Sequence, residues 1–302
     1  MTHPPTKGGR FEKRKSMPLS IMVLERNEEM METRYTASGV RMRLHSSREG
    51  GLNWLLLPGG HGIGSESLHE LADVMTVPGK IWLIDLPGDG SNTEHGGSDP
   101  FAKWPQVLLE AAHAFAHVVF VGHSTGGMYL LATPHLSHLV CGLALLDTAP
   151  DSAWHAEYIA MTQRDPLPAF EKAAIAYAKA ASIENLTTLC VSSAEWNFTP
   201  SALDAGRELL ARMPFNSAAV EWSDTHFDHT YKTLWWPDHL PVLRLWGDSD
   251  RIVSQRGWAT DVYNTSNVMA RAVPAAGHFP WIDNPAAVTE LFKEFSARLP
   301  SV

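Results

Sequence analysis

Residues 118–131 read VVFVGHSTGGMYLL, and this stretch decides the fold. Its four leading apolar residues predict a buried strand, its glycines a sharp turn, and its last residues the start of a helix. A Gly-x-Ser-x-Gly pattern in this setting holds a serine on a strained turn, with its hydroxyl exposed above a sheet. The helix that follows offers free N–H groups to a developing negative charge. We therefore predict that Ser124 is a nucleophile.

On both sides of this stretch, short apolar runs alternate with helical patterns. Fully apolar runs suit strands that are buried on both faces of a parallel sheet, and strand–helix alternation predicts a doubly wound α/β domain. The first two strands are joined by too short a link for a helix, so an antiparallel hairpin is expected at one edge. The expected strands are residues 32–37, 40–46, 53–57, 80–85, 117–122, 139–147, 241–247 and 268–274. The expected helices of this part are residues 67–75, 101–115, 126–132, 254–263 and 284–299.

The alternation stops at residues 151–238, whose pattern is mostly helical and which hold 12 of the chain's 28 aromatic residues. We predict that this segment is a helical cap inserted into the core domain, which takes residues 20–150 and 239–302. Residues 1–19 are rich in Pro, Gly, Lys and Arg and are predicted to be a disordered tail.

Charge and composition exclude several classes of protein. The net charge of the 302 residues is −9, and because the first sixteen residues carry +4, residues 17–302 carry −13. So acidic a body is a poor partner for nucleic acid or an anionic membrane. Apolar runs are far too short for a membrane span, and the N-terminus has no apolar signal region, so a cytoplasmic protein is expected. Two cysteines cannot make a disulfide framework or a Cys-rich zinc site.

A serine nucleophile needs a base, and the base needs an acid that orients it. Asp250 follows the strand expected at residues 241–247, and His278 follows the strand expected at residues 268–274. The carboxyl ends of parallel strands meet at one edge of the sheet, so Ser124, Asp250 and His278 are expected to converge there in the order Ser, Asp, His. For the acid, Asp248 and Asp147 stay open as alternatives.

Taken together, four motifs resemble those of the α/β-hydrolase superfamily from about residue 32 to the C-terminus. They are residues 57–62 (LPGGHG), 85–91 (DLPGDGS), 122–126 (GHSTG), and 247–250 (GDSD) with Gly277-His278. The resemblance implies an eight-stranded, mostly parallel sheet with helices on both faces and a helical cap. It also implies that Asp250 is the acid of the triad.

The same resemblance implies an oxyanion hole formed by the backbone N–H groups of Gly60 and Thr125. The loop at residues 58–62 is similar to the His-Gly-Gly-Pro-Gly motif of proline iminopeptidases, but Pro58 replaces its histidine and His61 replaces its proline. This departure weakens an iminopeptidase assignment and leaves the oxyanion role intact, because that role uses the backbone.

No cofactor or metal is predicted. There is no Walker A sequence, and the glycines of residues 60–64 are followed by Ser65 where a dinucleotide-binding motif has its third glycine. Asp224, His226, Asp228 and His229 offer metal-ligating side chains, but no further ligand spacing supports a metal site.

The predicted cap carries 12 acidic and 6 basic residues and is aromatic, which favours an apolar or cationic small molecule over a polyanion. We predict a serine hydrolase that cleaves a small-molecule ester or amide through an acyl-enzyme. The first alternative is an aminopeptidase similar to proline iminopeptidases. The alternative from another class is a catalytically idle protein that binds a ligand or partner on the same fold. Lactone and carbon–carbon bond hydrolysis use the same elements, and the substrate and oligomeric state stay open.

Overall fold

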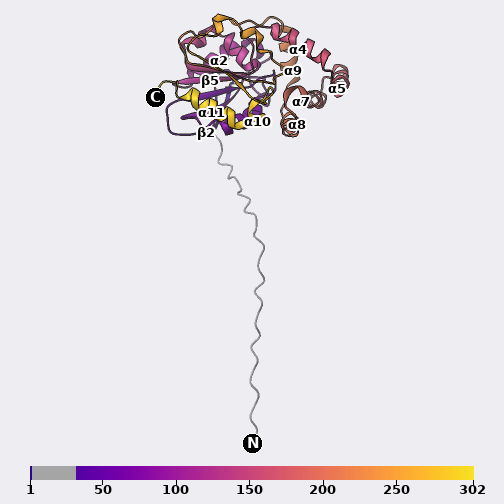
Figure 1. Cartoon of the computed structure of the whole chain (residues 1–302), viewed down its shortest axis with the longest axis horizontal. Helices are drawn as coiled ribbons and strands as arrows, with labels where there is room; N and C mark the ends of the chain where they lie inside the picture. Colours follow the sequence, from indigo (N-terminus) through magenta and orange to yellow (C-terminus); the bar gives the residue numbers. More distant parts are fainter. Residues whose placement is uncertain (2–31) are drawn as a thin grey trace. The chain divides into compact units, whose positions relative to one another are not determined.

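Eight strands form one sheet in the computed structural model, which describes Met1 and residues 32–302 (Figure 1). The order across the sheet is β1-β2-β4-β3-β5-β6-β7-β8. Strand β2 pairs antiparallel with both β1 and β4, and every later pairing in the sheet is parallel. The strands are β1 (Thr33–Tyr35), β2 (Arg41–Ser47), β3 (Asn53–Leu57), β4 (Lys80–Asp85), β5 (Val118–His123), β6 (Val140–Leu146), β7 (Val242–Gly247) and β8 (Val268–Val273).

This sheet confirms the predicted fold class, including the antiparallel hairpin at one edge. Each predicted strand is present, and its ends agree with the prediction to within two residues. The predicted tail at residues 1–19 and the predicted start of the core at residue 20 lie outside the described residues, apart from Met1.

Helices cover both faces of the sheet, because the side chains of its central strands alternate between two apolar cores. In β3, Trp54 and Leu56 pack into one core, while Leu55 and Leu57 pack into the other. Figure 1 shows α2 and α11 on opposite faces. The first core also contains side chains of α1 (His69–Val74), α10 (Pro280–Asp283) and α11 (Pro285–Ser296), and the second those of α2 (Trp104–His113) and α3 (Thr125–Leu131).

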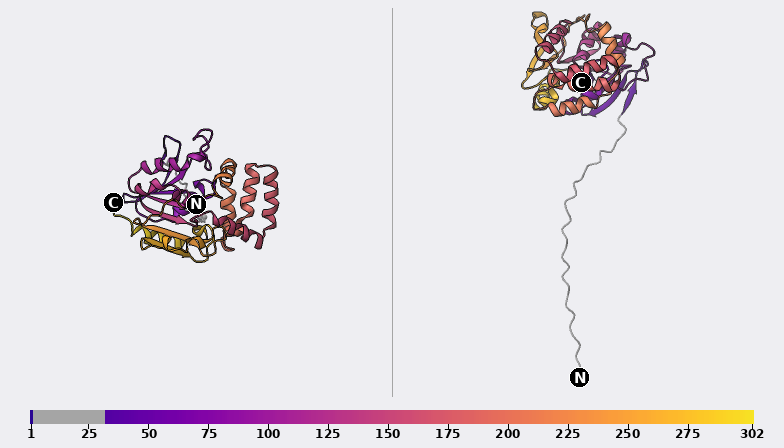
Figure 2. Two further views of the ribbon diagram at one scale, coloured as in Figure 1. Left: turned by 90° about the horizontal axis from the view of Figure 1, so that it is seen from above. Right: turned by 90° about the vertical axis from the view of Figure 1, so that its right-hand side faces the viewer.

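Six further helices lie between β6 and β7 along the chain. Figures 1 and 2 show them as a group beside the sheet, away from its two covered faces. Within this group, Trp196 is buried and packs edge-on against Tyr158 and Phe170. We call residues 153–226 the helical segment: α4 (Ala153–Arg164), α5 (Pro168–Lys179), α6 (Ile183–Ser192), α7 (Ala194–Asn197), α8 (Leu203–Ala211) and α9 (Ser217–His226).

One predicted helix is wrong. Residues 254–263 form two short 3-10 helices instead of one α-helix, because side chains take the carbonyls that an α-helix would need. The Asn264 amide donates to the carbonyls of Trp258 (2.9 Å) and Thr260 (2.7 Å). The 3-10 helices of the structure are η1 (Ser65–Leu68), η2 (Phe101–Lys103), η3 (Pro134–His138), η4 (Gln255–Trp258) and η5 (Asp261–Tyr263). None of the helices described combines the length and the apolar character that crossing a membrane requires.

Candidate active site

Ser124 lies on a strained turn between β5 and α3. Its backbone has φ 49° and ψ −122°, a conformation that L-residues adopt only when the surrounding structure enforces it. Its N–H donates to the Leu146 carbonyl of the neighbouring strand at 2.8 Å. Gly126 allows the turn to lie against the loop after β3, since a Cβ there would come within 2.3 Å of the Pro58 carbonyl oxygen. The sheet and this contact together fix the position of the serine.

His278 and Asp250 lie in the loops after β8 and β7, as the sequence order requires. The Nδ1 atom of His278 is 3.1 Å from Asp250 Oδ2, and both side chains are buried. Asp250 Oδ1 accepts the backbone N–H groups of Ile252 (2.8 Å) and Val253 (3.2 Å), which hold the carboxylate in place. In a neutral imidazole whose Nδ1–H donates to Asp250, Nε2 carries the free lone pair and can accept a proton.

Ser124 and His278 line one cavity of about 360 Å³, although no hydrogen bond joins Ser124 Oγ to the His278 ring. Such bonds often form only once substrate is bound. Asp248, one of the alternative acids, is exposed and receives hydrogen bonds from Ser249 and Ala276 rather than from His278. The rest of the cavity wall is mainly apolar, and a large share of it comes from the helical segment: Tyr158, Phe170, Leu186, Leu189, Leu210, Phe215 and Val220.

Asp147, the other alternative acid, is buried at the end of β6 with φ 47°. Its Oδ1 accepts the Gly247 N–H at 2.9 Å, and its Oδ2 has no partner in the described part of the chain. Burial, and then the charge of Asp250, raise the pKa of Asp147 well above its ordinary value. The raised pKa favours the protonated form of Asp147, in which Oδ2 could donate a hydrogen bond.

The side chains of Asp147, Asp250 and His278 each place a ligand atom within 4.8 Å of the others, a spacing that a cation could use. The oxygen and nitrogen atoms of these side chains fit a hydrogen-bond network better than a metal site. One oxygen of Asp147 and both oxygens of Asp250 already accept protein N–H groups. A neutral Asp147 would also be a poor ligand for a cation.

The loop after β3 brings Gly60 next to the serine. Gly60 has φ 52° and lines the cavity together with Thr125. Across the residues that the structure describes, neither backbone N–H donates a hydrogen bond to the protein. Gly59 has to be a glycine, because a Cβ there would lie 2.6 Å from the Cβ of Ser124. Two unpaired N–H donors thus border the cavity on the serine side.

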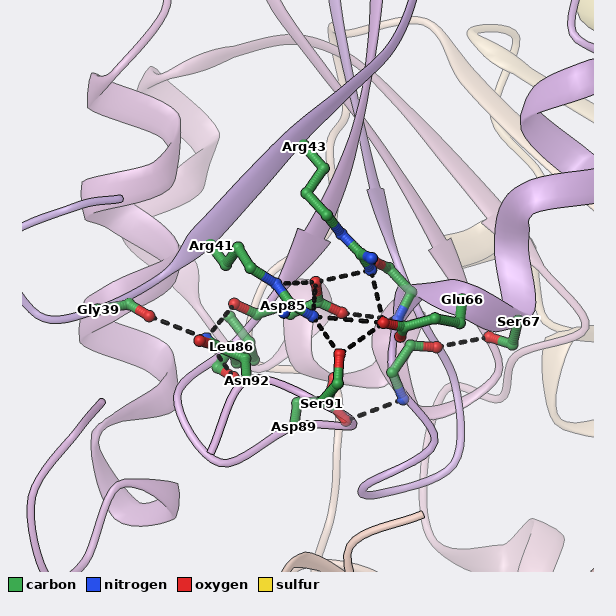
Figure 3. Close-up of polar contacts among 12 residues, drawn as sticks. Gly39, Arg41, Arg43, Glu66, Ser67, Asp85, Leu86, Asp89, Ser91 and Asn92 are labelled. Carbon is green, nitrogen blue, oxygen red and sulfur yellow. Dashed lines mark hydrogen bonds and ion pairs between the residues drawn. The ribbon is translucent and has the colours of Figure 1, made fainter. Parts of the chain in front are cut away.

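The far end of this loop is held by a network of buried charges (Figure 3). Asp85, at the end of β4, accepts the Ser65 N–H at 2.7 Å and pairs with Arg41 and Arg43. Asp89 accepts the Gly64 N–H at 3.2 Å. Burial, and then the charge of Asp85, raise the pKa of Asp89 well above its ordinary value, which favours its protonated form.

The middle of the same loop is held by the His61 side chain, which sequence analysis did not identify. Tyr129 Oη lies 2.6 Å from His61 Nδ1, and Asp228 Oδ1 lies 3.1 Å from His61 Nε2. Burial alone would raise the pKa of Asp228, but the hydrogen bond and charge of His61 lower it. The position of His61 directly after Gly60 could have indicated that its side chain lies near the site. Its pairing with Asp228 was not visible, because the two residues are far apart in the sequence.

His123, beside the serine, was also missed. Its Nε2 lies 2.9 Å from the backbone carbonyl of His278, and the two rings are 4.8 Å apart. Burial, and then the charge of His278, lower the pKa of His123 well below its ordinary value. A neutral His123 therefore supports the His278 loop from behind as a hydrogen-bond donor.

The helical segment contacts the His278 loop directly. The His278 N–H donates to the Asn197 carbonyl of α7 at 2.8 Å. A Cβ on Gly277 would lie only 2.3 Å from that carbonyl oxygen, so the approach requires a glycine at this position.

Comparisons with known proteins agree with this fold. The family model described as "Alpha/beta hydrolase family" matches residues 54–291. Pimeloyl-[acyl-carrier protein] methyl ester esterase of Xanthomonas oryzae pv. oryzae is 24% identical over 239 residues, which cover 73% of this chain and 86% of that protein. The structure of a proline iminopeptidase-related protein from Thermus thermophilus has a TM-score of 0.67 and 22% identity, covering 89% and 98% of the two chains. An esterase from Rhodococcus sp. ECU1013 has a TM-score of 0.62 and 17% identity, covering 89% and 99%.

The raised pKa of Asp147 predicts how Asp147→Asn changes stability with pH. The folded protein keeps a proton on Asp147 that the unfolded chain releases above about pH 3.9, so this group's contribution to stability falls as pH rises from there toward the raised pKa. An asparagine keeps a neutral donor of the same shape. We expect the melting temperature of the variant, relative to wild type, to increase between pH 4.5 and 7.5 by about 2–4 °C.

Asp147→Ala is the control, because alanine cannot accept the Gly247 N–H and is expected to destabilise the protein at every pH. A difference between Asp147→Asn and wild type that stays constant over this pH range would contradict a neutral Asp147.

Proposed function

Because the chain belongs to the alpha/beta hydrolase family, we propose that it is a serine esterase that cleaves a small-molecule ester through an acyl-enzyme. The observation that carries this proposal is the His278 Nδ1–Asp250 hydrogen bond of 3.1 Å at a cavity that Ser124 also lines. The helical segment acts as the cap that forms the apolar wall of this cavity.

In the proposed reaction, Ser124 Oγ attacks the ester carbonyl carbon and its proton passes to His278 Nε2. Asp250 keeps His278 in the required tautomer and stabilises the imidazolium that forms. The N–H groups of Gly60 and Thr125 hold the oxygen that becomes negative. When the carbon–oxygen bond breaks, His278 returns the proton to the leaving alcohol. A water molecule, activated by the same histidine, then releases the acid from Ser124.

The cavity favours an apolar acyl group on a free small molecule. Its wall is mainly aliphatic and aromatic, and such walls bind a ligand by burying apolar surface. Residues 151–238 have twice as many acidic as basic residues, which disfavours an anionic carrier. The relative from Xanthomonas oryzae is named for a methyl ester on an acyl-carrier protein. For this chain we propose a simple ester of the same bond type.

An aminopeptidase is the second candidate, and Asp228 is the observation that favours it. This carboxylate lines the cavity, and its lowered pKa keeps it ionised although it is largely buried. A negative charge at this position could pair with the free amine of a substrate.

We expect Ser124→Ala to lose turnover of p-nitrophenyl butyrate by at least about a thousandfold, because members of a triad act as a unit. The variant should also fail to react with a fluorophosphonate probe, which labels only an activated serine. Ser201→Ala, at an exposed position, is the control and is expected to keep both activities. A folded wild-type protein that is neither labelled nor active would instead identify an idle binding protein.

Asp250→Asn is expected to reduce kcat by roughly 10³–10⁴-fold, because an amide at this position favours the wrong tautomer of His278. Asp147→Asn is the matched variant and should stay within a few fold of wild type, since it imitates a neutral acid. Steady-state kinetics on the same ester measure both. If Asp147→Asn instead loses far more activity than Asp250→Asn, the acid of the triad is Asp147.

A pair of arylamides separates the two candidate functions. An esterase is expected to cleave prolyl arylamide and N-acetylprolyl arylamide slowly and at similar rates, and both much more slowly than the ester. If only the substrate with a free amine is cleaved rapidly, Asp228 recognises that amine and the aminopeptidase is correct.

A further inference from the structure

The His61 side chain joins three parts of the site. His61 directly follows Gly60 in the loop after β3. Its Nδ1 lies 2.6 Å from the hydroxyl of Tyr129, which belongs to α3, the helix that begins at Thr125. Its Nε2 lies 3.1 Å from Asp228, which follows the last helix of the helical segment. The His61 imidazole therefore connects the Gly60 loop to α3, which carry the two proposed oxyanion donors. It also connects both to the stretch directly after the helical segment.

This ring has no freedom to act as a base. Nε2 is paired with the Asp228 carboxylate and Nδ1 with the Tyr129 hydroxyl, so both nitrogens are occupied. Aromatic rings surround it: Trp104 stacks at 6.3 Å, and Tyr129 and Phe227 pack edge-on at 5.3 and 5.7 Å. Its side chain is only 6% exposed. The two partners and the surrounding rings thus hold the orientation of His61.

We propose that His61 is a positioning residue of the oxyanion hole, and that Asp228 makes the geometry of this hole depend on the seating of the helical segment. The inference rests on the proposed function, because it requires Gly60 and Thr125 as the donors. Gly60 has φ 52° and no side chain of its own to hold it, so its N–H direction depends on its neighbours. The Tyr129–His61 hydrogen bond sets the distance between the Gly60 loop and α3.

Asp228 makes the second of the two contacts that hold the His61 ring, after that of Tyr129. Its pKa is lowered although burial opposes this, with the His61 contact the largest of the lowering effects, so the ionised acceptor is favoured. When the segment that carries Asp228 is seated, the imidazole is held from both sides. When it moves away, Nε2–H loses its acceptor and the ring can turn. Oxyanion stabilisation is sensitive to such changes, because its donors act at fixed positions in the transition state.

The test uses Tyr129→Phe in the full chain, with Tyr231→Phe as a closely matched control. Both tyrosines are buried to the same extent, both rings pack against Phe227, and each variant removes one buried hydroxyl. Only the Tyr129 hydroxyl contacts His61, whereas that of Tyr231 donates to the Ala149 carbonyl. Equal changes in melting temperature would confirm that the two variants differ in contact rather than in stability.

We expect Tyr129→Phe to lower kcat for p-nitrophenyl butyrate about tenfold with KM within twofold of wild type. This is less than the 10²–10³-fold that loss of an oxyanion donor itself costs. The inhibition constant of a trifluoromethyl ketone, whose adduct with a serine carries an oxyanion, should rise by the same factor. Tyr231→Phe should leave both values unchanged. Equal kinetics of the two tyrosine variants, or a change confined to KM, would overturn the inference.

Two substitutions of Asp228 test its contact with the His61 ring. Asp228→Ala removes the acceptor and is expected to lower kcat about tenfold, while Asp228→Asn keeps an oxygen acceptor and should recover most of that loss. The double variant Tyr129→Phe/Asp228→Ala should lose less than the product of the two single effects, because both act on one ring. If Asp228→Asn is as impaired as Asp228→Ala, the charge and not the hydrogen bond matters, and the positioning role is wrong.

Fluorophosphonate labelling separates this inference from the proposed function. If wild type is labelled at Ser124 and Tyr129→Phe keeps full ester turnover, only the inference fails. If folded wild type is not labelled, the proposed function fails and the inference fails with it.

Discussion

The site depends on one strained residue, Ser124, whose backbone is held at a positive φ by its neighbours. A hydrogen bond to Leu146 fixes it to the next strand, and α3 begins directly after it. That conformation turns the hydroxyl out of the sheet and points the first N–H groups of the helix toward the same space. Two glycines are consequences of this turn, because it lies so close to the loop after β3 that a Cβ on Gly126 would collide with Pro58, and one on Gly59, in that loop, with Ser124.

Buried aspartates occur in two pairs near this turn, and in each pair one member has a raised pKa. Asp147 lies beside Asp250, and Asp89 lies beside Asp85. Two neighbouring buried carboxylates carry a large electrostatic cost when both are charged, which favours a proton on the member with the raised pKa. In that protonated form it can donate a hydrogen bond where a carboxylate could only accept. The first pair lies behind His278, and the second holds the loop that carries Gly60.

Local patterns in the sequence were enough to predict the sheet, since apolar runs of four or five residues mark strands that are buried on both faces. The proximity of His278 to Asp250 and to the cavity that Ser124 lines was predictable too, because a parallel sheet brings the carboxyl ends of its strands to one edge. The contact of His61 with Asp228 was not predictable, since the two residues are 167 positions apart in the chain. The two 3-10 helices at residues 255–263 were missed because the Asn264 amide makes local hydrogen bonds to the Trp258 and Thr260 carbonyls, which compete with an α-helix and were not read from the sequence.

The helical segment and the stretch that follows it make polar contacts with the site at two places. The Asn197 carbonyl accepts the N–H of His278, and Asp228 pairs with the ring of His61. Elsewhere the cavity wall is mainly apolar, as at Phe170 and Leu186. Apolar packing has no preferred direction and adjusts to different shapes. On the proposed function, selectivity should be strict at the ester bond and tolerant along the acyl chain attached to it, a pattern that suits an enzyme that meets many related molecules.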